Sequence, residues 1–360
     1  MTATNNHAEG ALLVRSARQL LDEGRRHEMA GQSSLAVECY AAVIDYNASD
    51  KDQRAHAEAL RRLAVLHHLR AESGIAADLC RRSHEVATLA GEPDLAADAS
   101  NALAGFALEH GDLTGATELY SSALQLADGN PALVGKIEQN LGIVANIRGD
   151  WAKALEHYER SLEAYKSICD TRGCAIAHHN LGMIHTKRKN WPEADRNYRR
   201  CHGLAEAVGD RHLSGLAALN RAEVRLAIED YEGAKAGAEQ ALRIFNEVEA
   251  RRDKAGAHRL LGMVFRQRGQ MALAESHLRS ALEIAAGAQC PLTEADAARE
   301  LARLYHLQLR RDAAVNLLER ARAVYQRLEA AADLKDVEEQ IASVRSSALN
   351  ESPETRGLHA

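Results

Sequence analysis

Histidine and cysteine are the side chains in this sequence best suited to metal chemistry, and the chain has 17 histidines and six cysteines. Zinc ligands carried by one helix are spaced at i and i+4. No two histidines have that spacing, although Cys174 and His178 do, with His179 adjacent. No third ligand is evident, so we interpret the pair as a buried thiol and a packing histidine. We therefore predict neither a metal site nor a cofactor.

The segment from Gly129 to Lys136 is the part of the chain most like a phosphate-binding loop. Five residues separate its glycines where that loop requires four, and Ile137 follows where a Ser or Thr would meet magnesium. The sequence also has no GxSxG or GxGxxG motif. We interpret the segment as a connection between helices and predict a protein without catalytic activity.

A recurring alanine indicates the structure that positions these residues. It returns after 40, 40, 38, 40, 40, 40 and 40 residues, at Ala36, Ala76, Ala116, Ala154, Ala194, Ala234, Ala274 and Ala314. A fixed period of this kind predicts a linear array of about eight copies of one structural unit.

Further columns run in register with this marker alanine. Twelve residues earlier every repeat has Gly or Ala, and one residue before that six repeats have Leu, with Glu23 and Arg221 as the exceptions. Four residues after the marker the side chain is most often Tyr or Leu. Steps of three, four and seven place these residues on one helical face, so each unit is predicted to be two closely packed helices joined by a tight turn. Polar breaks such as those at Asp170 and Asp210 supply an N-cap for the next helix.

The segment Asn140-Leu141-Gly142, followed by Gly149-Asp150-Trp151, Ala154, Tyr158 and Leu162, resembles a tetratricopeptide repeat. The resemblance covers about residues 18 to 330. The units run 40 residues against the family's usual 34, as in LGN-type adaptors, kinesin light chain and Rap-type bacterial regulators. The resemblance implies an all-α fold, a right-handed α–α superhelix (α-solenoid) of eight helix–turn–helix repeats.

The sequence also predicts where the array begins and ends. We expect residues 1–9 and 346–360 to be disordered and residues 10–345 to form a single solenoid. An apolar stripe of Leu334, Val337, Ile341 and Val344 predicts a capping helix over 333–345. The predicted repeats are 18–57, 58–97, 98–136, 137–176, 177–216, 217–256, 257–296 and 297–332.

The column just before the Leu-Gly pair holds Asn140, Asn180 and Asn220. In tetratricopeptide-repeat proteins this position lines the groove, and asparagines there grip the main chain of an extended peptide. A carboxamide suits that role because it both donates and accepts hydrogen bonds. The resemblance therefore implies that these three residues bind a peptide ligand.

Other groove positions of the family lie one residue before that column and three, six and seven residues after it. They map onto His179, Lys187, Arg259, Arg266, Arg299, Arg303 and His306, with Glu223 as the main acidic residue. This set predicts a basic C-terminal groove and a ligand with acidic side chains or a free carboxylate.

Charge and hydropathy exclude other classes of partner. The net charge of −6 gives no support to nucleic-acid binding, and we predict neither a membrane span nor a signal peptide. The scattered cysteines indicate reduced thiols.

We predict a cytoplasmic protein-interaction module that binds an extended segment of a partner protein. One alternative is a regulator whose superhelix responds to a short peptide or small molecule. The other is a homo-oligomeric scaffold in which the C-terminal tail of one chain docks in the groove of the next.

Overall fold

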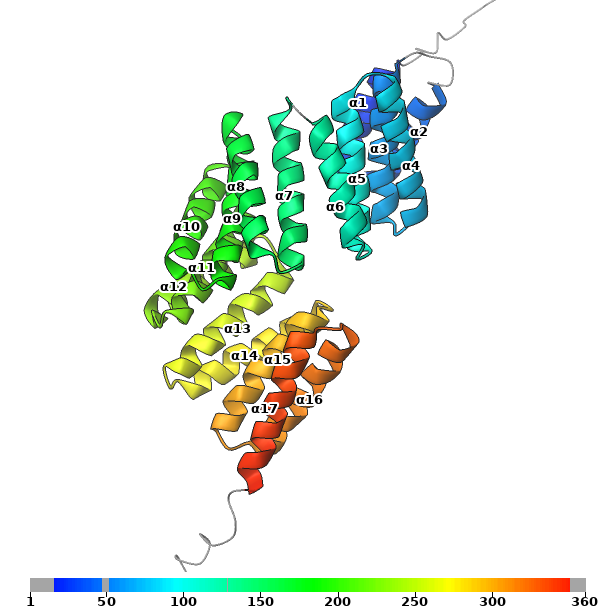
Figure 1. Ribbon diagram of the computed structural model, residues 1–360. Coiled ribbons are helices and arrows are strands. Elements are labelled where there is room, and N and C mark those ends of the chain that lie inside the picture. The colour runs from blue at the N-terminus through cyan, green and yellow to red at the C-terminus, as the bar shows by residue number, and fades with distance from the viewer. Residues whose placement is uncertain (1–15, 47–51, 128, 350–360) are drawn as a thin grey trace, which may run out of the picture. The chain divides into compact units, whose positions relative to one another are not determined.

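The computed structural model describes residues 16–46, 52–127 and 129–349, and within these ranges the regular structure is α-helical (Figure 1). The helices are α1 (Ala17–Met29), α2 (Ser33–Tyr46), α3 (Gln53–Leu69), α4 (Ser73–Leu89), α5 (Pro93–Glu109), α6 (Leu113–Leu126), α7 (Pro131–Ile147), α8 (Trp151–Ser167), α9 (Thr171–Lys187), α10 (Trp191–Ala207), α11 (Arg211–Ala227), α12 (Tyr231–Glu247), α13 (Arg251–Gln267), α14 (Met271–Gly287), α15 (Pro291–Leu307), α16 (Arg311–Arg327) and α17 (Ala331–Leu349). The predicted all-α class is confirmed.

The helices pack in consecutive pairs, from α1 with α2 to α15 with α16, and α17 packs on α16. Within each compact unit an odd-numbered helix also contacts the next odd-numbered helix, for example α11 with α13. The predicted architecture of eight helix–turn–helix repeats and a final capping helix is therefore confirmed. None of the described helices combines the length and apolar composition that crossing a membrane requires.

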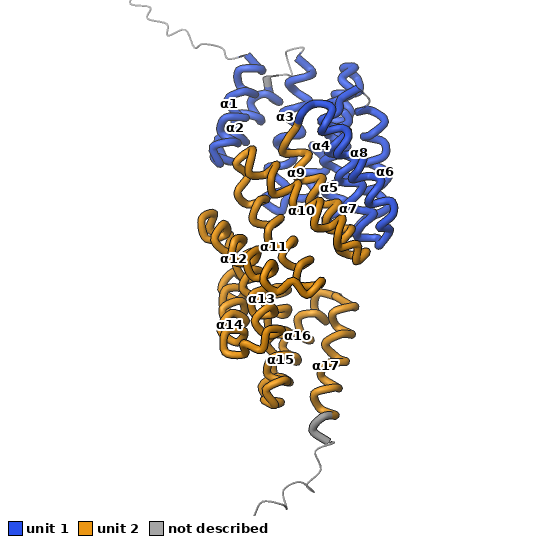
Figure 2. Tube along the Cα trace, turned by 90° about the vertical axis from the view of Figure 1, so that its left-hand side faces the viewer, with its two compact units in different colours: residues 1–169 blue, residues 170–360 orange. Residues whose placement is uncertain are grey.

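The chain divides into two compact units, unit 1 (residues 1–169) and unit 2 (residues 170–360), which Figure 2 distinguishes by colour. Unit 1 contains α1 to α8, and unit 2 contains α9 to α17. The sequence predicted one array over residues 10–345. The predicted tail segments 1–9 and 350–360 lie outside the described residues, whereas residues 346–349 belong to α17, which extends past the predicted end of the cap.

The two columns of small residues lie where paired helices approach most closely. All eight marker alanines are fully buried. A Cβ atom on Gly142 would lie 2.5 Å from Cε1 of Tyr158, and one on Gly262 would lie 2.5 Å from Cγ of Leu278. Glycine is therefore required at these positions because the facing residue of the second helix fills the space.

Local hydrogen bonds define the helix boundaries. The side chain of Asp170 accepts a hydrogen bond from the Gly173 amide at 2.8 Å, and that of Asp210 accepts one from the Leu213 amide at 3.1 Å, as predicted for N-caps. The turn after a helix contains a residue with positive φ, such as Gly149 at 77°. This left-handed residue reverses the chain after the last helical turn.

Candidate peptide-binding face

Two of the three predicted asparagine ligands, Asn140 and Asn220, bridge neighbouring odd-numbered helices. In unit 1, Nδ2 of Asn140 on α7 donates to Oδ1 of Asn101 on α5 at 2.9 Å. In unit 2, Nδ2 of Asn220 on α11 donates to Nε2 of His179 on α9 at 2.9 Å. Asn180 is only 7% exposed. Each bridging carboxamide keeps an acceptor oxygen and a second N–H available for another partner, so the role in ligand binding stays a prediction.

His179 is a neutral acceptor in this arrangement. Burial lowers the pKa of His179, while its hydrogen bond with Asn180 acts in the opposite direction. A neutral imidazole leaves Nε2 free to accept from Asn220. The ring also meets that of Tyr198 on α10 edge to face, with ring centroids 5.9 Å apart.

In unit 2 the side chains at the family's groove positions form a surface on α9, α11, α13, α15 and α17 that we call the odd-helix face. On this face Nη2 of Arg266 lies 3.0 Å from Oε2 of Glu300, and Nη1 of Arg303 lies 2.5 Å from Oε1 of the same carboxylate. Glu300 is 2% exposed. The two arginines therefore neutralise a buried carboxylate that would otherwise be unstable there.

The remaining groove arginines also have acidic partners. Arg299 on α15 lies 2.9 Å from Asp333 on α17, and its guanidinium stands over the ring of Tyr325, 5.5 Å from the centroid. Arg259 on α13 lies 3.1 Å from Glu223 on α11.

These pairs correct the expectation of a basic C-terminal groove. The arginines are matched by carboxylates, and two of these, Asp333 and Asp336, belong to α17. The sequence predicted Glu223 as the main acidic residue, and the acidic residues of the capping helix were not expected to contribute. Most of these partners were missed because the ion pairs join neighbouring helices and residues more than 30 positions apart, as with Arg299 and Asp333.

Lys187 and His306 are the remaining predicted groove residues, and neither belongs to the ion pairs described above. Lys187 is exposed at the end of α9. His306 on α15 lines a small hollow of about 60 Å³ together with Gln340 of α17. Its Nδ1 atom is buried and has no hydrogen-bond partner within the described part of the chain.

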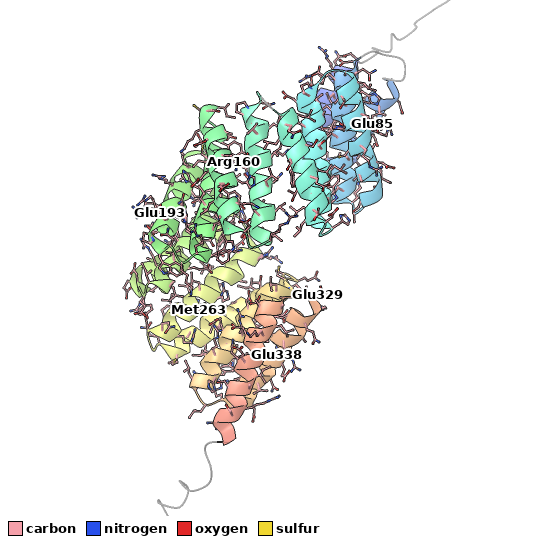
Figure 3. All side chains as sticks on the ribbon, viewed as in Figure 1. Glu85, Arg160, Glu193, Met263, Glu329 and Glu338 are labelled. Carbon is pink, nitrogen blue, oxygen red and sulfur yellow. The ribbon has the colours of Figure 1, made fainter. Side chains whose placement is uncertain are left out.

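The odd-helix face contains a larger cavity of about 600 Å³ between α11 and α13, which we call the α11–α13 hollow. Leu226, Tyr231 and Met263 give it apolar walls, and the Arg259–Glu223 ion pair lies at its edge. Figure 3 labels Met263 on α13. Met263 and Leu226 occupy the groove positions three and six residues after the asparagine column. Neither residue was predicted from the sequence, because only the polar side chains at those positions indicated binding.

One group of side chains in the described residues has the spacing of metal ligands: Glu23, His27 and Cys39, whose donor atoms lie within 4.8 Å of one another. Nδ1 of His27 donates to Oε1 of Gln32 at 2.6 Å, which leaves Nε2, 4.0 Å from Oε1 of Glu23, as the coordinating nitrogen. The group could hold zinc after small side-chain shifts. The sequence search missed it because Cys39 comes from a second helix.

The Cys174–His178 pair is buried, and Nδ1 of His178 lies 2.8 Å from Oδ1 of Asn197. That contact fits the packing role expected for this histidine.

The repeated helix pairs agree with a comparison to known protein families. The model of the tetratricopeptide repeat matches residues 94–167, 133–207, 173–247 and 253–327. The chain belongs to the tetratricopeptide-repeat family. No curated protein sequence matches the chain significantly. Tetratricopeptide repeats across the chain support a role as a protein-interaction scaffold.

Solved tetratricopeptide-repeat structures share the fold at low sequence identity. A signal-transduction ATPase (STAND) protein with a tetratricopeptide repeat sensor from Pyrococcus horikoshii has a TM-score of 0.69 and 16% identity, over 91% of this chain and 50% of that one. A Rap protein complexed with Competence and Sporulation Factor has a TM-score of 0.58 and 12% identity, over 93% and 98%. Aspartyl phosphate phosphatase F from Bacillus subtilis has a TM-score of 0.56 and 11% identity, over 96% of both chains. At these identities the likeness shows the fold.

Proposed function

We propose that the odd-helix face of unit 2 binds an extended segment of a partner protein, with one apolar side chain of that segment in the α11–α13 hollow. The observation that carries the proposal is the hollow itself. Its volume of about 600 Å³ is in the range of natural ligand sites. It also lies at the positions that line the groove in this family.

The walls of the hollow suit a peptide side chain. Met263 is unbranched and polarisable, so it adapts to ligands of different shape, and Leu226 and Tyr231 add apolar surface. An acidic group of the partner would compete with Glu223 for Arg259. Both members of this pair are partly exposed, so exchanging one carboxylate for another costs little electrostatic energy.

The asparagine column would then hold the peptide main chain. Asn220 lies one helical turn before Glu223 on α11 and retains its carboxamide oxygen for a peptide N–H. The interaction with His179 fixes the orientation of the carboxamide before the ligand arrives. This preorganisation reduces the entropy lost on binding.

The proposal includes no catalytic step. The fold alone does not decide this point, because one structural neighbour is named as a phosphatase. We further propose that the protein acts in the cytoplasm. All six cysteines are free thiols, which fits a reducing compartment.

A displayed library of random 12-residue peptides would test the function. The library is selected against the full chain, and enriched peptides are measured by fluorescence anisotropy. We expect peptides with an apolar anchor residue to be enriched. Their affinity should fall at least tenfold for Met263→Glu, because a charge in the hollow opposes burial of the anchor.

The control is Leu273→Glu, which places the same charge on an exposed apolar residue of the even-numbered helix α14. Peptides that bind the Leu273 variant normally and the Met263 variant poorly support the odd-helix face. Failure to enrich any peptide, or equal loss in both variants, would contradict it.

A further inference from the structure

A second cavity in unit 2 lies among α10, α11 and α12. It has a volume of about 260 Å³ and is lined by three arginines, Arg221 and Arg225 on α11 and Arg243 on α12. We call it the arginine hollow. Arg221 and Glu223 are two residues apart on one helix, so their side chains point about 200° apart around its axis. The arginine hollow is therefore distinct from the odd-helix face.

The hollow results from departures from the repeat pattern. Arg221 stands where six repeats have Leu, and Gly237 stands where the other repeats have Cys, Leu, His or Asn. A Cβ atom on Gly237 would lie 2.9 Å from Cβ of Ala222, and one on Gly233 would lie 2.7 Å from Nη1 of Arg225. The two glycines therefore make room for guanidinium groups beside the α11–α12 contact.

Positive charge in the hollow is incompletely neutralised. Nε of Arg221 lies 2.6 Å from Asp195, but this carboxylate also pairs with Arg199 at 2.6 Å. Nε of Arg225 lies 3.9 Å from Asp230, too far for a hydrogen bond.

The third guanidinium, that of Arg243, has no ion pair or hydrogen bond with any described residue. Of the described side chains that line the hollow, none carries a carboxylate.

A carboxamide donor, that of Gln240, also lines the site. Gln240 lies one turn before Arg243 on α12, and its carboxamide nitrogen Nε2 lies 3.3 Å from Nε2 of His202 on α10. The other ring nitrogen of His202 lies 2.9 Å from the hydroxyl of Ser214. These contacts hold Gln240 and His202 at the wall of the hollow, where a carboxamide N–H can reach a bound anion.

We propose that the arginine hollow binds a phosphate group, either as free phosphate or as a phosphomonoester of a small molecule. Three guanidinium groups from two helices offer more donors than one carboxylate can accept in good geometry. A phosphate group has three acceptor oxygens and a charge of about −1.5 to −2 at neutral pH. It matches both the number of donors and the surplus of positive charge.

The test is to titrate the full chain with inorganic phosphate, and separately with phosphoserine, at constant ionic strength set by chloride. Binding is measured by calorimetry and by the thermal midpoint. We expect saturable stabilisation by at least one of the two, and the tighter ligand identifies the source of the phosphate group. Succinate serves as the dicarboxylate comparison and should bind more weakly.

Two variants remove the donors without disturbing the fold. Arg221→Leu restores the residue that six repeats use at this position, and Arg243→Ala changes an exposed side chain that pairs with no residue in the described part of the chain. Each should raise the Kd for phosphate about tenfold or more, since a hydrogen bond to a charged group contributes on the order of 1.5–3 kcal/mol.

Arg252→Ala, on the exposed start of α13, removes the same charge elsewhere and should leave the Kd unchanged. The proposal is overturned if phosphate binds no better than chloride, or if succinate binds as tightly as phosphate. It is also overturned if all three variants lose the same affinity.

Discussion

Asn220 on α11 and His179 on α9 share a hydrogen bond of 2.9 Å between positions 41 residues apart in the sequence. The contact joins equivalent helices of consecutive repeats. It also makes two residues of the predicted groove depend on each other, because the carboxamide orientation is set by the imidazole. The odd-helix face therefore has polar contacts that stabilise the array in addition to any role in binding.

The first prediction concerns this contact. Asn220→Ala should lower the free energy of unfolding by about 1–2 kcal/mol, because Nε2 of His179 loses its donor in a partly buried place. Urea unfolding followed by circular dichroism measures the change. Asn316→Ala, at an exposed position of α16, is the matched control and should be neutral or slightly stabilising. Equal stability of both variants would show that the bond contributes nothing.

The second prediction concerns pH. Burial is the largest cause of a lowered pKa for His56, His179, His258 and His277. The unfolded chain takes up protons at these residues below about pH 6.5, whereas the folded chain does so only at lower pH. Stability should therefore be fully present above pH 6.5 and decrease as the pH falls from there toward the folded-state pKa values.

A substitution in the contact between His258 and His277 tests this prediction. Their Nδ1 atoms lie 3.0 Å apart, so the pair cannot be fully protonated without repulsion. The urea midpoint of unfolding should decrease as the pH is lowered from 7.5 to 5.5. The decrease should be smaller for His277→Gln. A midpoint that is constant over this range in the wild-type chain would disprove the prediction.

The third prediction concerns the contact between paired helices. Gly142→Ala should destabilise the chain by about 1–3 kcal/mol, because the added methyl group would overlap the ring of Tyr158. A Cβ atom on Gly203, inside α10, would meet no atom within 4 Å. Gly203→Ala should therefore raise the free energy of unfolding by up to about 1 kcal/mol. Thermal midpoints of the two variants should move in opposite directions. A stabilised Gly142 variant would mean that the helices separate easily at this point.

The fourth prediction concerns the buried carboxylate of the odd-helix face. Glu300→Gln should lower the free energy of unfolding by about 3 kcal/mol. Arg266 and Arg303 keep their charges in this variant but lose the negative charge between them. Glu338→Gln is the control, since that side chain is exposed on α17 (Figure 3). Urea unfolding at neutral pH should separate the two variants clearly. A loss of less than about 0.5 kcal/mol for Glu300→Gln would place the ion pairs among weak surface contacts.

The sequence by itself determined the helix pairs, their register and their caps. These features depend on local periodicity: side chains three, four and seven residues apart share a helical face, and an Asp before a helix bonds to amides three residues on. The column of Gly and Ala twelve residues before the marker alanine also followed from local periodicity. Gly142 and Tyr158 face each other within one repeat, so a small residue recurs at the first position in every period and faces Tyr or Leu in most of them.

Only the tertiary structure decided which charged residues meet. Arg266 pairs with Glu300, and Arg299 with Asp333, across 34 residues in each case, and nothing in the repeat pattern names these partners. Glu23 and Arg221 were visible in the sequence as departures from a leucine column, but their surroundings were not. The energy of an ion pair, a metal site or a cavity depends on distance and burial, and both are established only when neighbouring helices pack.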